Sequence, residues 1–142
     1  MEKILSYDTL KGHYEAEACV VWCFDDRFTG LLWEFTKDME NFDLVKVAGG
    51  AKALAEGASP ARDFVQEQVA TSLRLHGAKK VVLMLHEDCG AYGGSKRFAD
   101  KETEQVFYVS QLDIAQDFVE SFVGDVPVET YYGTFDGLYQ AP

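Results

Sequence analysis

Three residues of the kinds that bind transition metals stand where two apolar segments finish. Cys23 ends the apolar run 18–24, and His86 and Cys89 follow the apolar run 81–85. Cysteine thiolates and histidine nitrogens are zinc ligands, and a zinc ion with three protein ligands keeps a fourth position for water or substrate. The sequence therefore predicts one zinc ion per chain, bound by Cys23, His86 and Cys89 with one position open.

Asp25 and Arg27 stand next to the first predicted ligand. In an extended segment, residues two apart point to the same side, so both are expected on the side of Cys23. The planar guanidinium of Arg27 matches a carboxylate and would hold Asp25 ionised and oriented toward the metal. Asp25 would then accept a hydrogen bond from zinc-bound water or bind the ion itself. We expect Asp25 and Arg27 to be the catalytic pair.

The segments that must position these residues alternate between strands and helices. Strands are expected at 18–24, 43–48, 79–85 and 126–132, with a possible edge strand in 134–139, and helices at 26–37, 60–76 and 100–123. Such alternation predicts an α/β fold of three layers: a mostly parallel central sheet of about four strands with helices on both faces. We expect a single domain over 1–142, with residues 1–16 as an N-terminal helical arm. Ligands of such sheets gather at the carboxyl ends of the strands.

The third expected helix, at 100–123, carries a row of apolar residues that should face the sheet. This row contains Val106, Val109, Leu112, Ala115, Val119 and Phe122. The helix at 60–76 has clearer boundaries, because Ser59 is a favourable N-cap, Pro60 suits the first helical position, and Gly77 can end the helix.

Composition narrows the classes of function. Lysine and arginine number 13 and aspartate and glutamate 24, so the net charge of −11 argues against nucleic-acid binding. The longest apolar runs are the length of strands, which predicts no membrane span, and the absence of an apolar leader predicts a cytoplasmic protein. Three cysteines, an odd number, suit a reducing compartment and metal-binding thiols. Cys19 is expected to be a buried apolar residue, about 13 Å from Cys23 in an extended strand.

Two motifs resemble the signature of the β-class carbonic anhydrases. They are Cys23-x-Asp25-x-Arg27 and His86-x-x-Cys89-Gly90. Weaker similarity to the same family occurs at 45–50, which ends in Ala-Gly-Gly, and at 128–139. The resemblance covers about residues 18–139 and implies the same zinc ligands, with Asp25 and Arg27 as a dyad that positions the zinc-bound water. It also implies a homodimer or higher homo-oligomer.

The resemblance implies reversible hydration of CO2 to bicarbonate by zinc-bound hydroxide that the Asp25–Arg27 dyad orients. His13 and His76 could carry the product proton. Two alternatives remain open. The same site could hydrolyse a CO2-like molecule such as carbonyl sulfide or carbon disulfide. The chain could instead be a non-catalytic zinc-binding module that senses oxidation through its thiolates; Asp26 favours this alternative, because the family usually has a small residue there.

Overall fold

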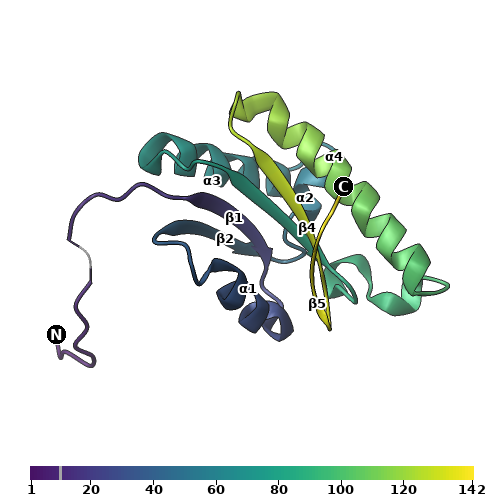
Figure 1. Cartoon of the computed structure of the whole chain (residues 1–142), viewed down its shortest axis with the longest axis horizontal. Coiled ribbons are helices and arrows are strands. Elements are labelled where there is room, and N and C mark those ends of the chain that lie inside the picture. Colours follow the sequence, from purple (N-terminus) through teal and green to yellow (C-terminus); the bar gives the residue numbers. More distant parts are fainter. Residues whose placement is uncertain (10) are drawn as a thin grey trace.

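The computed structural model describes residues 1–9 and 11–142, and these contain a five-stranded sheet. Its strands are β1 (Ala18–Cys23), β2 (Phe42–Val47), β3 (Val81–His86), β4 (Val128–Thr134) and β5 (Gly137–Gln140). In space they follow the order β2-β1-β3-β4-β5. The first four are parallel, and β5 returns antiparallel to β4. The expected parallel sheet and its edge strand are therefore confirmed (Figure 1).

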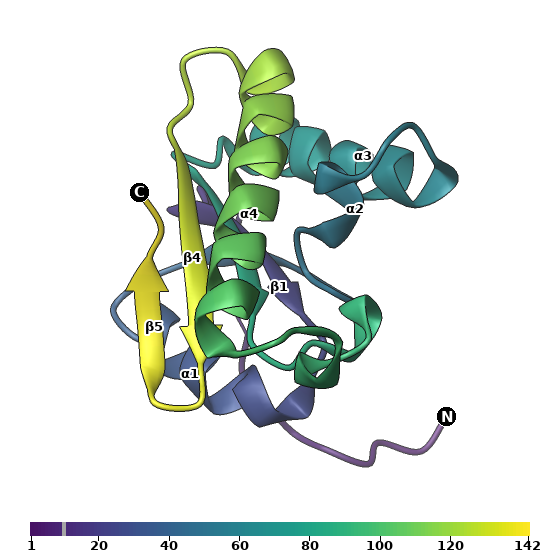
Figure 2. The ribbon, with the colours of Figure 1, turned by 90° about the vertical axis from the view of Figure 1, so that its right-hand side faces the viewer.

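Helices cover both faces of the sheet (Figure 1). They are α1 (Thr29–Thr36), α2 (Lys52–Ala55), α3 (Pro60–His76) and α4 (Lys101–Val123), with the short 3-10 turns η1 (Asp26–Phe28), η2 (Gly90–Tyr92) and η3 (Ser95–Arg97). α1 covers one face, while α2, α3 and α4 cover the other, where α4 runs along β4 (Figure 2). The expected three layers are present.

The central strands are apolar throughout because each contributes to two cores. In β1, Val20 and Trp22 pack with Leu32 of α1 on one face. The alternate residues Cys19 and Val21 pack on the opposite face with α3 and α4. Every residue of β1 and of β3 is buried, as a parallel sheet covered on both faces requires. Cys19 is thus the buried apolar residue that was expected.

Local signals set the boundaries of the helices. The hydroxyl of Ser59 accepts a hydrogen bond from the backbone N–H of Arg62, and Pro60 is the first residue of α3. Gly77 ends α3 in the left-handed conformation, with φ of 55°. Asp100 caps α4, since its carboxylate accepts the N–H of a residue in the first turn. The three predicted signals around α3 are confirmed.

The helical arm expected at 1–16 is wrong for the part of the chain that the structure describes. Residues 1–9 and 11–16 contain no helix, and position 10 lies outside the described residues. Ile4, Leu5 and Tyr7 are exposed, so this segment has no apolar face packed against the sheet that would stabilise a helix. Residues 1–9 lie away from the sheet (Figure 1).

The face that α4 buries also differs from the expected row. Its buried residues are Glu104, Tyr108, Leu112, Ala115, Val119 and Val123. Val106 is instead 64% exposed, and Val109 and Phe122 are only partly buried. The buried face of α4 is rotated from the expected one because Tyr108 packs against Tyr132 of β4, and because the carboxylate of Glu104 accepts the backbone N–H of Asp88 in the loop after β3.

Among the described residues, no helix is long and apolar enough to cross a membrane.

Candidate metal centre

The three predicted ligands meet at the carboxyl edge of the sheet. Cys23 is the last residue of β1 and His86 the last of β3, and these strands are neighbours. Cys89 follows in the turn after β3. The ligand atoms of Cys23, His86 and Cys89 all lie within 4.8 Å of one another, and all three residues are buried. The topology therefore brings Cys23 next to His86 and Cys89, which lie more than sixty positions later in the sequence.

His86 presents one ring nitrogen to this group. Its Nδ1 lies 2.7 Å from the backbone oxygen of Glu87, and since a carbonyl can only accept, Nδ1 carries the proton. Its Nε2 is buried, without a hydrogen-bond partner among the described residues. The ring also packs against Phe28, at 4.2 Å between centroids. A histidine fixed through Nδ1–H with a bare Nε2 has the orientation of a metal ligand.

The two cysteines differ in their protonation. A hydrogen bond from the Cys89 thiol lowers the pKa of Cys23, although burial opposes this. The same hydrogen bond, together with burial, raises the pKa of Cys89. The backbone N–H groups of Gly49 and Asp25 lie 3.3 and 3.5 Å from the Cys23 sulfur and support its negative charge. Cys23 is thus a thiolate near neutral pH, and metal binding would release the proton of Cys89.

A turn of two glycines passes directly behind Cys23. Gly50 has φ of +57°, and a Cβ atom there would lie 2.4 Å from the Met84 carbonyl oxygen. Gly49 has φ of +78° and directs its N–H at the Cys23 sulfur. The sequence indicated only the end of a strand here and a weak similarity of 45–50 to the β-class carbonic anhydrases. Its role in supporting the thiolate depends on the distance between two separate strands, which a sequence motif does not contain.

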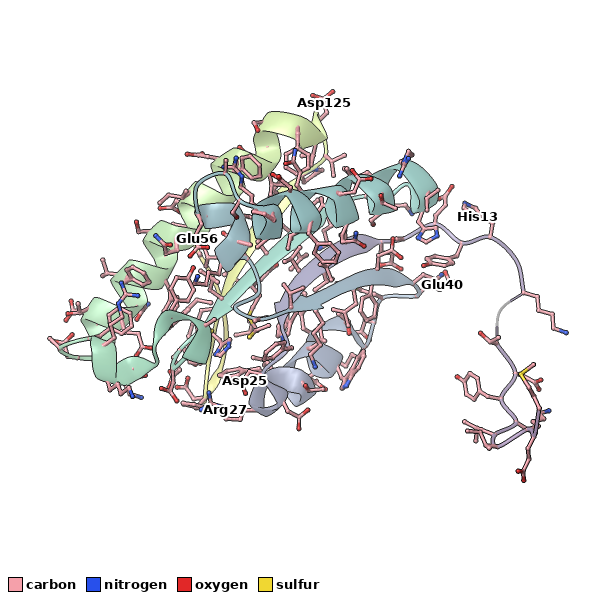
Figure 3. The ribbon with its side chains drawn as sticks, turned by 180° about the vertical axis from the view of Figure 1, so that it is seen from behind. His13, Asp25, Arg27, Glu40, Glu56 and Asp125 are labelled. Carbon is pink, nitrogen blue, oxygen red and sulfur yellow. The ribbon has the colours of Figure 1, made fainter. Side chains whose placement is uncertain are left out.

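Asp25 and Arg27 form the expected ion pair. Arg27 Nη2 lies 2.6 Å from Asp25 Oδ2, and Arg27 Nε lies 3.0 Å from Oδ1. These hydrogen bonds lower the pKa of Asp25 to about 2. Figure 3 shows the two residues side by side at one edge of the molecule. Asp25 is therefore a fixed carboxylate anion.

The pair forms for a different local reason than an extended strand. β1 ends at Cys23, and Asp25 is the N-cap of η1. Its Oδ1 accepts the backbone N–H of Arg27 at 3.1 Å, which curls the chain and brings the guanidinium onto the carboxylate. The expectation of a continuing extended segment is wrong, whereas the pairing itself is present.

A pocket of about 480 Å³ opens beside the sulfur atoms. Its lining comprises Cys23, Phe24, Asp25, Asp26, Ala48, Gly49, Cys89, Gly90 and Ala91. Phe24 is 62% exposed at this pocket, and sequence reasoning missed it because it reads as the last apolar residue of the strand. Asp26 also lines the pocket, so the acidic residue between Asp25 and Arg27 borders the same cavity as the sulfur atoms.

His13 and His76 lie at the opposite end of the sheet. His76 Nδ1 is 2.8 Å from a carboxylate oxygen of Asp43, near the start of β2, and the His13 ring lies beside the His76 ring. Figure 3 shows His13 far from Asp25 and Arg27. The idea that these histidines carry a proton from the site is wrong, because parallel strands separate their amino ends from the carboxyl edge.

The fold and this group together define an α/β protein with a buried Cys-His-Cys set that can bind a metal ion. A family model described as "Putative carbonic anhydrase" matches residues 14–136. The chain belongs to this carbonic anhydrase family.

Three known proteins illustrate the likeness. The β-carbonic anhydrase isoform I of Trichomonas vaginalis superposes with a TM-score of 0.67 at 13% identity, covering 96% of this chain and 87% of that one. The apo form of a carbon disulfide hydrolase superposes with a TM-score of 0.52 at 15% identity, covering 91% and 80%. The uncharacterized protein RC0076 of Rickettsia conorii is 25% identical over 96% of this chain and 77% of its own length. The structural matches confirm the predicted fold.

Proposed function

We propose that the protein is a zinc-dependent carbonic anhydrase that hydrates CO2 reversibly to bicarbonate, with one Zn²⁺ per chain bound by Cys23, His86 and Cys89. The observation that carries this proposal is the convergence of the three ligand atoms within 4.8 Å, beside the Asp25–Arg27 pair. The bare, buried Nε2 of His86 and the thiolate of Cys23 fit a zinc ion. Family membership supports the same activity.

Bound zinc would lower the pKa of a water molecule in its fourth position, which provides a nucleophile near neutral pH. The carboxylate of Asp25 would accept a hydrogen bond from that water. Three N–H groups of Arg27, the Nε, the Nη2 and the backbone one, bind the carboxylate, and the Nε–H is shared between Oδ1 and Oδ2 at 3.0 and 3.2 Å. A carboxylate offers about four acceptor positions, so three donors leave one for the water. Arg27 keeps Asp25 ionised, so that Asp25 accepts the hydrogen bond and does not donate one.

The walls of the pocket suit a small, uncharged substrate. Ala48, Gly49, Gly90 and Ala91 present small side chains or none, and Phe24 adds an apolar face. CO2 lacks hydrogen-bond donors and needs no dedicated charged partner. The acidic Asp25 and Asp26 at the same pocket would favour the departure of the bicarbonate anion by repulsion.

The proposal is tested by measuring zinc content and stopped-flow CO2 hydration on the same zinc-loaded sample. We expect about one zinc per chain and a measurable turnover of CO2. Cys23→Ser should lose both, because a hydroxyl remains protonated and binds zinc poorly. A fully zinc-loaded wild-type protein that hydrates no CO2 would overturn the proposal.

A hydrolase of carbon disulfide or carbonyl sulfide is the second candidate. The observation in its favour is the structural match to a carbon disulfide hydrolase. The same pocket would have to admit larger sulfur atoms. Release of hydrogen sulfide from either substrate, without CO2 hydration, would favour this candidate. Zinc loss on peroxide treatment, with neither activity, would favour a redox-sensing module.

We also propose a cytoplasmic homodimer or larger homo-oligomer. The three cysteines are free, which suits a reducing compartment. Phe24 and Trp33 are more than half exposed, and Leu44 is exposed on the edge strand β2. Apolar side chains at an unpaired strand edge are typical of an interface.

A further inference from the structure

Asp88 lies between the proposed metal ligands His86 and Cys89 in the sequence, but its hydrogen bonds reach Arg27 in the loop after β1. Its Oδ2 accepts a hydrogen bond from Arg27 Nη1 at 2.9 Å, and its backbone oxygen accepts one from Nη2 at 3.1 Å. The same guanidinium binds Asp25 through Nε and Nη2. One arginine therefore connects the loop after β1, which follows Cys23, to the loop after β3.

Asp88 is itself fixed by three further constraints. It has φ of 53°, a left-handed conformation that aspartate and asparagine tolerate better than most residues. Its backbone N–H donates to Glu104 at 2.7 Å, and Glu104, on α4, is only 2% exposed. Its Oδ1 accepts the backbone N–H of Ser95 at 2.8 Å. The carboxylate that holds Arg27 is thus anchored to the core and to the loop before α4.

This anchoring has a consequence for Asp25. Asp25 lines the same pocket as Cys23 and Cys89, and carboxylates are zinc ligands. The Asp25 carboxylate lies outside the group of ligand atoms that are within 4.8 Å of one another. To coordinate the metal it would have to move, and it would then either leave Arg27 or draw the guanidinium along with it. Hydrogen bonds to Asp88 oppose the second route, because Arg27 would lose them by moving. An arginine with one carboxylate partner would lack this restraint.

We propose that Asp88 is a positioning residue: it anchors Arg27, so that Arg27 keeps Asp25 away from the metal and leaves the fourth position open to an external ligand. The inference rests on the proposed metal centre and deepens it. It assigns a role to a side chain within His-x-x-Cys that binds neither metal nor substrate. Glu104 and Ser95 support that role through the backbone and carboxylate of Asp88.

The test uses the full chain loaded with Co²⁺, whose visible absorption reports the ligands of the metal. Azide is the probe, since it binds an open position and changes the spectrum. Asp88→Asn keeps the side-chain shape and suits the left-handed backbone, but it replaces the charged carboxylate that faces Arg27 with a neutral amide. We expect azide to bind this variant about fivefold more weakly than wild type, a change in keeping with the loss of a half-exposed ion pair.

A second substitution separates positioning from damage. In Asp88→Asn/Asp25→Asn, the residue that would occupy the fourth position is a poor ligand, so azide affinity should return to that of Asp25→Asn alone. Asp88→Gly, which removes the side chain and accepts the positive φ, should weaken azide binding as Asp88→Asn does. Asp113→Asn, on the exposed side of α4, is the matched control for lost charge and should bind azide like wild type.

Each outcome bears on the inference. Unchanged azide affinity in Asp88→Asn and Asp88→Gly would overturn it, as would a double variant that binds azide as weakly as Asp88→Asn. A wild-type protein that takes up no cobalt would overturn the metal centre and this inference together. A cobalt protein that behaves as expected, while the zinc protein hydrates no CO2, would contradict the proposed function and leave the role of Asp88 in place.

Discussion

The chemistry proposed here depends on how single side chains are protonated. Cys23 is held as a thiolate by a hydrogen bond from Cys89 and by the N–H of Gly49, while Cys89 keeps its proton. His86 directs its bare Nε2 at the same point. Asp25 stays ionised because Arg27 binds it. The donor set is therefore nearly in the state that zinc requires, and one thiol proton is the main exception.

The first prediction concerns that proton. The Cys89 thiol lowers the pKa of Cys23, whereas the same contact and burial raise the pKa of Cys89, so Cys23 carries the negative charge of the pair. Zinc binding near pH 7.5 should release about one proton from the cysteine pair, and zinc affinity should rise with pH. Titration calorimetry in two buffers of different ionisation enthalpy measures the released protons. Release of two protons from the cysteines would contradict the assignment of a preformed thiolate.

At the scale of elements, strand ends and tight turns place the ligands. Alternation of apolar strands with capped helices made the sheet predictable, and parallel strands bring Cys23 and His86 to one edge. The sequence could not show that β1 ends in a capping turn at Asp25, or that Asp88 adopts a positive φ. Those features depend on partners that lie far away in the sequence. The face of α4 was misjudged because Glu104, a charged residue, is buried to bind the Asp88 backbone.

The second prediction tests the turn behind the site. Gly50→Ala would force a residue with φ of +57° to carry a Cβ 2.4 Å from the Met84 carbonyl oxygen. We expect a loss of at least about 2 kcal/mol in the free energy of unfolding, measured by urea denaturation. Gly30→Ala is the control: Gly30 lies in α1 with open space around it, so alanine there should stabilise by about 0.5–1 kcal/mol. Equal effects would show that crowding at Gly50 is unimportant.

The third prediction concerns the cluster at the amino end of the sheet. Burial opposes ionisation of Asp43, but hydrogen bonds from Tyr14, Ser72 and His76 outweigh it and lower the pKa of this carboxyl. A lowered pKa in the folded state contributes stability above the unfolded value near 4 and loses it as the pH falls through the folded value. Asp43→Asn should therefore cost about 1–2 kcal/mol at pH 7 and progressively less on acidification. Denaturant curves at several pH values measure this; a constant difference would contradict it.

At the scale of the whole molecule, the two ends of the sheet have different roles. The carboxyl edge holds the proposed metal centre, while the amino end ties residues before β1 to β2 through Tyr14 and Asp43. The zinc ligands could be predicted from sequence because their types and strand-end positions are visible there. The positions of His13 and His76 in the fold could not be predicted, because these residues were proposed as proton carriers from residue type alone. The surface adds the exposed Leu44 on the edge strand β2, which we propose lies in the interface of the oligomer that the family resemblance implies.

The fourth prediction tests that edge. Leu44→Lys places a charge on the outermost strand, where a partner strand or helix would pack. We expect wild type to sediment as a dimer or larger oligomer, and Leu44→Lys to shift toward the monomer. Ile114→Lys, at a similarly exposed apolar position on α4, should leave the assembly unchanged. A monomeric wild type would refute the proposed assembly, and equal effects of both variants would place the interface elsewhere.

The central claim is that Asp25, held by Arg27, serves a metal ion bound by Cys23, His86 and Cys89. Its most direct test compares stopped-flow CO2 hydration by wild type and Asp25→Asn at equal, measured zinc content. The account predicts full zinc loading in both and a fall in kcat of about 100-fold in the variant, the scale of a lost proton acceptor. Equal turnover in the two zinc-loaded proteins would contradict it.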